Sequence, residues 1–188
     1  MSIITKFMMT HLVMSILGIM VGLAVLTIDG ESTGFSSIAI IASVFTIGFM
    51  CFMHYDDSFF CGVKEGIRAK SEGTQADTLK GLKIALIGYI PVFVVSITVV
   101  LLQIFNPENA VIPMLLFYFF QGSFMSLYAL QDYVGVIGYV IISLLPAIIS
   151  STLGFAIGSK DKTLRGMMGM NVKPPFDGPL ERKPKNKN

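Results

Sequence analysis

The sequence has little charge, few cysteines and no tryptophan. Charged residues make up 14% of the 188 residues, against roughly 25% in an ordinary soluble domain, which argues against a soluble globular protein. Cys51 and Cys61 are the only cysteines, one in an apolar run and one in a polar stretch, so a disulfide framework is not indicated. Without tryptophan, any aromatic belt at a membrane interface must consist of Tyr and Phe.

The signatures of common catalytic and metal sites are also missing. The sequence contains no HExxH, GxSxG, Walker A or CxxC motif, so neither a hydrolase nor a metalloprotease is supported. The acidic motif of lipid-head-group transferases is matched at one step, by Gly73 and Asp77, but Gly81 stands where that motif requires a final Asp. We therefore expect a protein that is not an enzyme and that holds no cofactor and no metal. A lipid-modifying enzyme is the least favoured alternative.

Long apolar runs are what the sequence has in abundance. Hydrophobic residues make up 53% of the chain, gathered in runs of about twenty, the length at which a helix crosses a bilayer. The predicted fold is an all-α integral membrane protein with spans near 7–28, 35–53, 84–105 and 133–158, and an irregular apolar segment at 110–130. In the first span, one helix face carries His11, Ser15, Gly18 and Gly22, and its GxxxG pair is interpreted as internal packing rather than homodimerisation.

Basic residues predict the orientation. The polar stretch 54–83, interpreted as a loop, contains five Lys and Arg residues, whereas the connections 29–34 and 106–109 contain none. Because Lys and Arg mark the cytoplasmic side, the loop and the N-terminus are predicted to be cytoplasmic. The basic, proline-rich tail 164–188 is predicted to be disordered and cytoplasmic as well. All basic segments share one side only if one apolar run fails to cross.

The run predicted not to cross is 110–130, which contains Pro113 and the polar Gln121 and has a very short exit. It is expected to lie in the outer interface or to re-enter without crossing. The predicted architecture is therefore four spans plus one irregular or re-entrant segment. Five spanning helices are the alternative.

Several short motifs resemble a known group of proteins. They are the segment Asp77–Ile84 leading to Ile90-Pro91, the pair Leu145-Pro146, and Gly158-Ser159-Lys160. By these motifs the chain resembles uncharacterised small polytopic membrane proteins of clostridia and related Gram-positive bacteria. It departs from them after Tyr55, where an acidic pair replaces a basic, aromatic run. The resemblance implies a location in the bacterial cell membrane and no particular activity.

Seven polar or helix-breaking positions are candidates for a functional site: His11, His54, Asp56, Asp57, Pro91, Gln121 and Pro146. An ionisable residue within a span is a functional candidate by default, although the leading interpretation of His11 is a bond to a neighbouring helix or to headgroups. The His54 stretch with its two acids is an alternative site for a divalent cation, with interfacial anchoring as the leading interpretation. The two prolines predict kinks.

The leading functional hypothesis is an accessory or interaction subunit of a larger membrane system, because two polar cytoplasmic segments are free for contacts. The alternative is a small transporter or channel component, with helices broken at Pro91 and Pro146 lining the pathway. The expected partners are the lipid bilayer, anionic headgroups bound by the basic tail, and another membrane protein. Nucleic acid is not expected, since no aromatic residues interleave with the basic ones and no RNA-binding signature is present.

Overall fold

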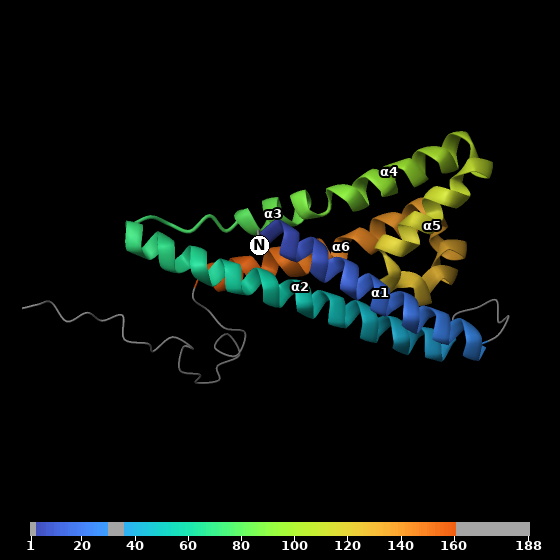
Figure 1. Ribbon diagram of the computed structural model, residues 1–188, viewed down its shortest axis with the longest axis horizontal. Helices are drawn as coiled ribbons and strands as arrows, with labels where there is room; N and C mark the ends of the chain where they lie inside the picture. The colour runs from blue at the N-terminus through green and yellow to red at the C-terminus, as the bar shows by residue number, and fades with distance from the viewer. Residues whose placement is uncertain (1–2, 30–35, 161–188) are drawn as a thin grey trace, which may run out of the picture.

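The computed structural model describes residues 3–29 and 36–160, and every regular element within them is helical, which confirms the predicted all-α fold. Three helices are each long and apolar enough to cross a membrane: α1 (Ile3–Asp29), α2 (Ser37–Glu72) and α6 (Gln131–Ser159). The basic tail predicted at 164–188, and most of the connection at 29–34, lie outside the described residues. Figure 1 shows the N-terminus, the connection from α2 to α3 and the end of α6 at the same end of the bundle.

The next segment is a bent pair of helices, α3 (Lys80–Gly88) and α4 (Ile90–Phe105), which meet at an angle of 59°. The break lies at Tyr89, directly before Ile90-Pro91. Proline lacks the N–H that would bond to the carbonyl four residues earlier, and its ring collides with that carbonyl. The kink predicted from Pro91 is therefore confirmed.

A second bent pair follows the short 3-10 turn η1 (Pro107–Ala110). Helix α5 (Val111–Phe120) and the 3-10 segment η2 (Gly122–Leu130) meet at 120°. Beyond the turn, η2 runs beside α1 in the same direction, with Ser123 against Gly18 and Met125 against Gly22. The segment thus enters the bundle and returns to the end where it began, as Figure 1 shows. This path agrees with the predicted re-entrant segment, and the candidate spans number three to five.

The predicted small face of α1 explains why this turn is tolerated inside the bundle. A Cβ at Gly18 would overlap the backbone of Ser123, so only glycine permits the approach. One turn earlier, the Ser15 hydroxyl accepts a hydrogen bond from the Gly122 N–H at 2.7 Å and donates one to the Phe119 carbonyl. Backbone groups at membrane depth must find partners within the protein, and α1 supplies them.

The stretch 54–83 differs from its prediction as a loop. Helix α2 continues without interruption to Glu72 and ends at Gly73, whose φ of 68° is the left-handed conformation typical of a helix C-terminus. The reason is tertiary contact: a Cβ at Gly62 or Gly66 would overlap the backbone of α6 at Phe155 or Ser159. These glycines form the face on which α6 packs. The connection is only residues 73–79.

The predicted break at Pro146 is also wrong. Pro146 lies inside α6, and the non-helical residue of that helix is Gly135, with φ 72° and ψ 166°. The φ of proline is compatible with a helix, so one lost hydrogen bond need not end it. A positive φ is a larger departure, and glycine adopts it without steric cost.

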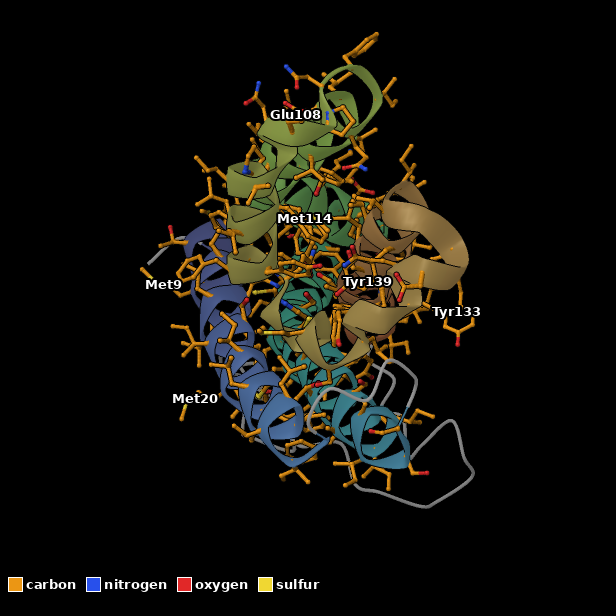
Figure 2. All side chains as sticks on the ribbon, turned by 90° about the vertical axis from the view of Figure 1, so that its right-hand side faces the viewer. Met9, Met20, Glu108, Met114, Tyr133 and Tyr139 are labelled. Carbon is orange, nitrogen blue, oxygen red and sulfur yellow. The ribbon has the colours of Figure 1, made fainter. Side chains whose placement is uncertain are left out.

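Apolar side chains cover the outside of the bundle as well as its core. In Figure 2, Met9, Met20 and Tyr133 point away from the bundle, whereas Tyr139 points inward. Met20 is 66% exposed, whereas Tyr139 is fully buried. A continuous apolar exterior on helices of spanning length is the surface that faces lipid. The chain is therefore a multi-pass helical membrane protein.

Candidate functional site

Four polar side chains gather where α1, α2 and the two bent pairs meet. They are His11 of α1, His54 of α2, Tyr89 between α3 and α4, and Gln121 between α5 and η2, and none is more than 3% exposed. We call these four residues the polar centre. Two of them stand at helix breaks, so the breaks bring polar groups into the interior. Ionisable side chains at this depth are costly and typically functional.

The imidazole of His11 contacts two other members of the polar centre. Its Nδ1 lies 3.2 Å from Nε2 of His54 and 3.1 Å from the Tyr89 hydroxyl. The ring centroids of the two histidines are 5.4 Å apart, and those of His11 and Tyr89 are 4.7 Å apart. The two histidines, 43 positions apart in the sequence, therefore form a hydrogen-bonded pair with a tyrosine hydroxyl beside it.

The outer nitrogens of this histidine pair are unpaired. Among the residues that the structure describes, His11 Nε2 and His54 Nδ1 are buried without a hydrogen-bond partner, whereas the Gln121 side chain lies beside the Tyr89 hydroxyl. A buried polar atom without a partner costs about 1–3 kcal/mol, and native proteins contain few of them. These two nitrogens make the histidine pair the candidate site.

An ion pair lies one turn along α2 from His54. The Asp57 carboxylate contacts the Lys6 ammonium at 2.6 Å and accepts a hydrogen bond from the Thr10 hydroxyl at 2.6 Å. The carboxylate is nearly buried, whereas the Lys6 side chain is 52% exposed. Asp57 thus ties the first turns of α1 to α2 and connects the neighbourhood of the polar centre to the surface.

Phe7 covers the histidine pair from the start of α1. Its ring centroid lies 4.3 Å from that of His54 and 5.5 Å from that of Tyr89, and the side chain is 2% exposed. Gly88 makes room for it, since a Cβ there would overlap the Phe7 ring. An aromatic ring packed on the imidazole shields it from water.

The structure brings together three of the seven predicted site residues and places a fourth beside them. His11, His54 and Gln121 belong to the polar centre, and Asp57 holds the ion pair next to it. Pro91 stands in the first turn of α4, beside a small cavity that His11 also lines. Asp56 and Pro146 take no part in these contacts.

The predicted alternative of a divalent cation gains no support. No group of three or more His, Cys, Asp or Glu side chains is placed to hold a metal ion anywhere in residues 3–29 and 36–160. The predicted pathway between Pro91 and Pro146 has no support either. The groove between α4 and α6 has a volume of about 270 Å³ and is lined by apolar side chains such as Ile97 and Val140, with Ser96 as its polar member.

Tyr89 and Phe7 are the residues that sequence reasoning missed. A tyrosine two positions before a proline inside a span marks a polar side chain at a helix break, and this signal is present in the sequence. Phe7 carries no such signal, because one apolar residue in an apolar run is like any other. Its role depends on contacts with α2 and with the α3–α4 break.

The chemistry open to the histidine pair is proton transfer. A neutral imidazole has one N–H and one bare nitrogen, so one proton occupies the 3.2 Å contact. When a proton binds His54 Nδ1, the proton on His54 Nε2 can move to His11 Nδ1, and the proton on His11 Nε2 can leave. One proton has then crossed the pair, and both rings are neutral with exchanged tautomers. His11 Nδ1 has one lone pair or one N–H, so it shares this position between His54 Nε2 and the Tyr89 hydroxyl.

The fold and the site define a class: a small multi-pass helical membrane protein with two bent helix pairs and a buried histidine pair. The chain matches no protein-family model, no curated protein and no solved structure. The polar centre is therefore the feature of this chain that bears on its function.

Proposed function

We propose that this protein is a proton-conducting component of a transport system in the bacterial cell membrane. One observation carries the proposal: two imidazoles are in hydrogen-bond contact at 3.2 Å, and both of their outer nitrogens are buried without a partner in residues 3–29 and 36–160. Those two nitrogens are the ends at which a proton enters and leaves. Proton relays in pumps and transporters are built from buried His, Asp and Glu side chains.

The ion pair of Lys6 and Asp57 gives the relay an inner end. The basic residues of α2 and α3 lie at the same end of the bundle as the N-terminus, which supports a cytoplasmic location for that end. A proton from the cytoplasm reaches the Asp57 neighbourhood first and then His54, one turn further into the bundle. The outer end is His11, beside the break at Pro91. Broken helices at a site near the middle of the membrane are typical of transporters.

The test is proton flux through the purified protein in liposomes. Vesicles loaded with a pH-sensitive dye receive a potassium diffusion potential, and the internal pH is followed. We expect flux above that of empty vesicles, and a loss of at least tenfold in His11→Leu and in His54→Leu. Thr98→Ala is the control, since Thr98 bonds only to its own helix at an exposed position. Wild-type flux equal to that of empty vesicles would refute proton conduction by the protein alone.

An accessory or interaction role is the second candidate, and the length of α2 favours it. Its 36 residues span about 54 Å at about 1.5 Å per residue, against a hydrocarbon thickness of about 30 Å. The projecting part is braced to α3 by Glu65, which contacts Lys80 at 2.7 Å. Ile67 is 47% exposed on this projection. A rigid helix outside the bilayer with an apolar residue among charges suits a protein partner.

Photo-crosslinking in cells tests this second role. A photoreactive residue at Ile67 is expected to capture one specific protein, whereas the same residue at Val94, which is 59% exposed on the bundle exterior, captures lipid. Equal patterns at both positions would contradict the role. We further propose that the basic tail, which lies outside the described residues, binds anionic lipid headgroups; weaker binding of a tail-truncated chain to anionic vesicles is the expected result.

A further inference from the structure

A small cavity borders His11 where α1 meets both helix breaks. Its lining includes His11 and Leu12 of α1, Pro91 and Val92 at the start of α4, and Phe120 at the end of α5. Its volume is about 20 Å³. The cavity is separate from the contact between the two histidines, which uses Nδ1 of His11. The nitrogen left for the cavity is Nε2, which is buried and has no partner among the described residues.

Two helix ends meet at this cavity. Helix α4 starts at Ile90, and Pro91 in its first turn has no N–H. Helix α5 stops at Phe120, where the Phe117 carbonyl accepts from Gln121 and the Phe119 carbonyl from Ser15. The Phe120 carbonyl lies near the His11 ring, but His11 Nε2 forms no hydrogen bond in the part of the chain that the structure describes. Two polar groups that are close but not bonded are commonly joined by a bridging water.

Size and polarity together indicate the ligand. A cavity needs about 10–15 Å³ to hold one water molecule, so about 20 Å³ has room for one. The backbone ends of α3, α4 and α5 border the cavity at Gly88, Pro91 and Phe120, so backbone polar groups of both kinds lie near it. A neutral molecule that both donates and accepts hydrogen bonds suits such surroundings.

We propose that this cavity is a binding site for a single water molecule, which bridges His11 Nε2 and the Phe120 carbonyl. The water completes the hydrogen bonds of His11 and fixes the tautomer of its ring. Binding of the water does not depend on proton conduction. If the proposed function holds as well, this water is the group next to the outer end of the histidine pair.

The chain has two histidines, which makes a direct test practical. The protein is labelled with ¹⁵N-histidine, placed in lipid bilayers and studied by solid-state NMR with magnetisation transferred from water. His11→Gln and His54→Gln assign the two rings. We expect water magnetisation to reach His11 Nε2 early and His54 Nδ1 later, because Phe7 covers that ring.

Filling the cavity should remove the water. Val92→Leu adds a methylene at the cavity wall and is expected to abolish the water signal at His11 Nε2 while the signals of both rings remain. Val94→Leu makes the same change at a site 59% exposed on the outside of α4 and is expected to leave the water signal unchanged. Leu12→Phe fills the cavity from α1 if the first variant does not fold.

Absence of water transfer to His11 Nε2 in the wild-type protein would overturn the proposal, and so would an unchanged signal in a folded Val92→Leu variant. Proton flux measured on the same variants separates the two proposals. Water transfer without flux refutes the relay and leaves the water site standing. Proton flux without water transfer to His11 Nε2 refutes the water site and leaves the relay standing.

Discussion

Phe7→Ala is the substitution that most directly tests how the polar centre is closed. Phe7 is 2% exposed and its ring packs against those of His54 and Tyr89. Two aromatic contacts at about 0.5–1.5 kcal/mol each give about 1–3 kcal/mol. The cavity left behind adds a further cost. In soluble cores a Phe→Ala change costs about 3–5 kcal/mol in total. In a membrane the part that comes from transfer out of water is smaller, because lipid is itself apolar. We expect a loss of about 3 kcal/mol in the free energy of unfolding.

The second expected effect of Phe7→Ala is access to His54. Diethyl pyrocarbonate acylates accessible neutral imidazoles, and mass spectrometry locates the product. His54 should become reactive in Phe7→Ala and stay protected in the wild-type protein. Phe52→Ala is the matched control, since Phe52 lies on α2 near His54 but is 59% exposed, and its loss should change the free energy of unfolding by no more than about 0.5 kcal/mol.

Two results would contradict this role of Phe7. One is a free energy of unfolding of Phe7→Ala within about 1 kcal/mol of the wild-type value. The other is a His54 that stays as protected from diethyl pyrocarbonate as in the wild-type protein. The first outcome would mean that the Phe7 contacts carry little energy. The second would mean that another group shields the imidazole. Unfolding is measured by denaturant titration in detergent micelles, with helix content followed by circular dichroism.

Three further predictions concern other contacts of the bundle. Asp57→Asn should lower the free energy of unfolding by about 1 kcal/mol, because the Lys6 ammonium is half exposed and screened; a double-mutant cycle with Lys6→Gln that showed additivity would contradict the ion pair. Gly18→Ala should cost about 2 kcal/mol through overlap with η2, whereas Gly48→Ala, with open space around it, should be neutral or stabilising. Tyr89→Phe should shift the ¹⁵N resonance of the imidazole nitrogen that its hydroxyl contacts, and unchanged resonances would exclude that hydrogen bond.

Local properties of the chain made much of the fold predictable. The thickness of a bilayer fixes the length of a spanning run, so the apolar runs identified the crossing helices directly. The kink at Pro91 follows from the covalent structure of proline. The prediction that 110–130 re-enters without crossing came from charge, because the basic segments share one side only if one run fails to cross. The 120° bend between α5 and η2 is compatible with a re-entrant segment and with a broken span.

The features that the sequence did not predict depend largely on contacts between segments far apart in the chain. Helix α2 extends to Glu72 because Gly62 and Gly66 meet α6, nearly a hundred residues further along the chain. Because the stretch 54–83 is polar, the sequence predicts a loop there. The break in α6 falls at Gly135 and not at Pro146, because a positive φ interrupts a helix more than a missing donor does. His11 and His54 were both singled out as candidates, yet nothing local indicated that they form a pair.

A structural role for the polar centre is the strongest rival to a functional one, because two helix breaks leave backbone groups that need partners. The two roles make opposite predictions for a combined substitution. Removing both partners of a buried hydrogen bond and replacing them with apolar groups of similar size can be nearly neutral or stabilising. If the centre serves function, a variant with His11→Leu, His54→Leu and Tyr89→Phe, which removes all three hydrogen-bonded partners, should have a free energy of unfolding within about 1 kcal/mol of the wild-type value or above it, and should conduct no protons. If the centre holds the breaks together, the same variant should lose several kcal/mol, and its loss of flux would reflect misfolding. Neither outer nitrogen of the histidine pair has a protein hydrogen-bond partner among the described residues, which favours the first outcome, because the substitutions then remove only the bonds within the polar centre.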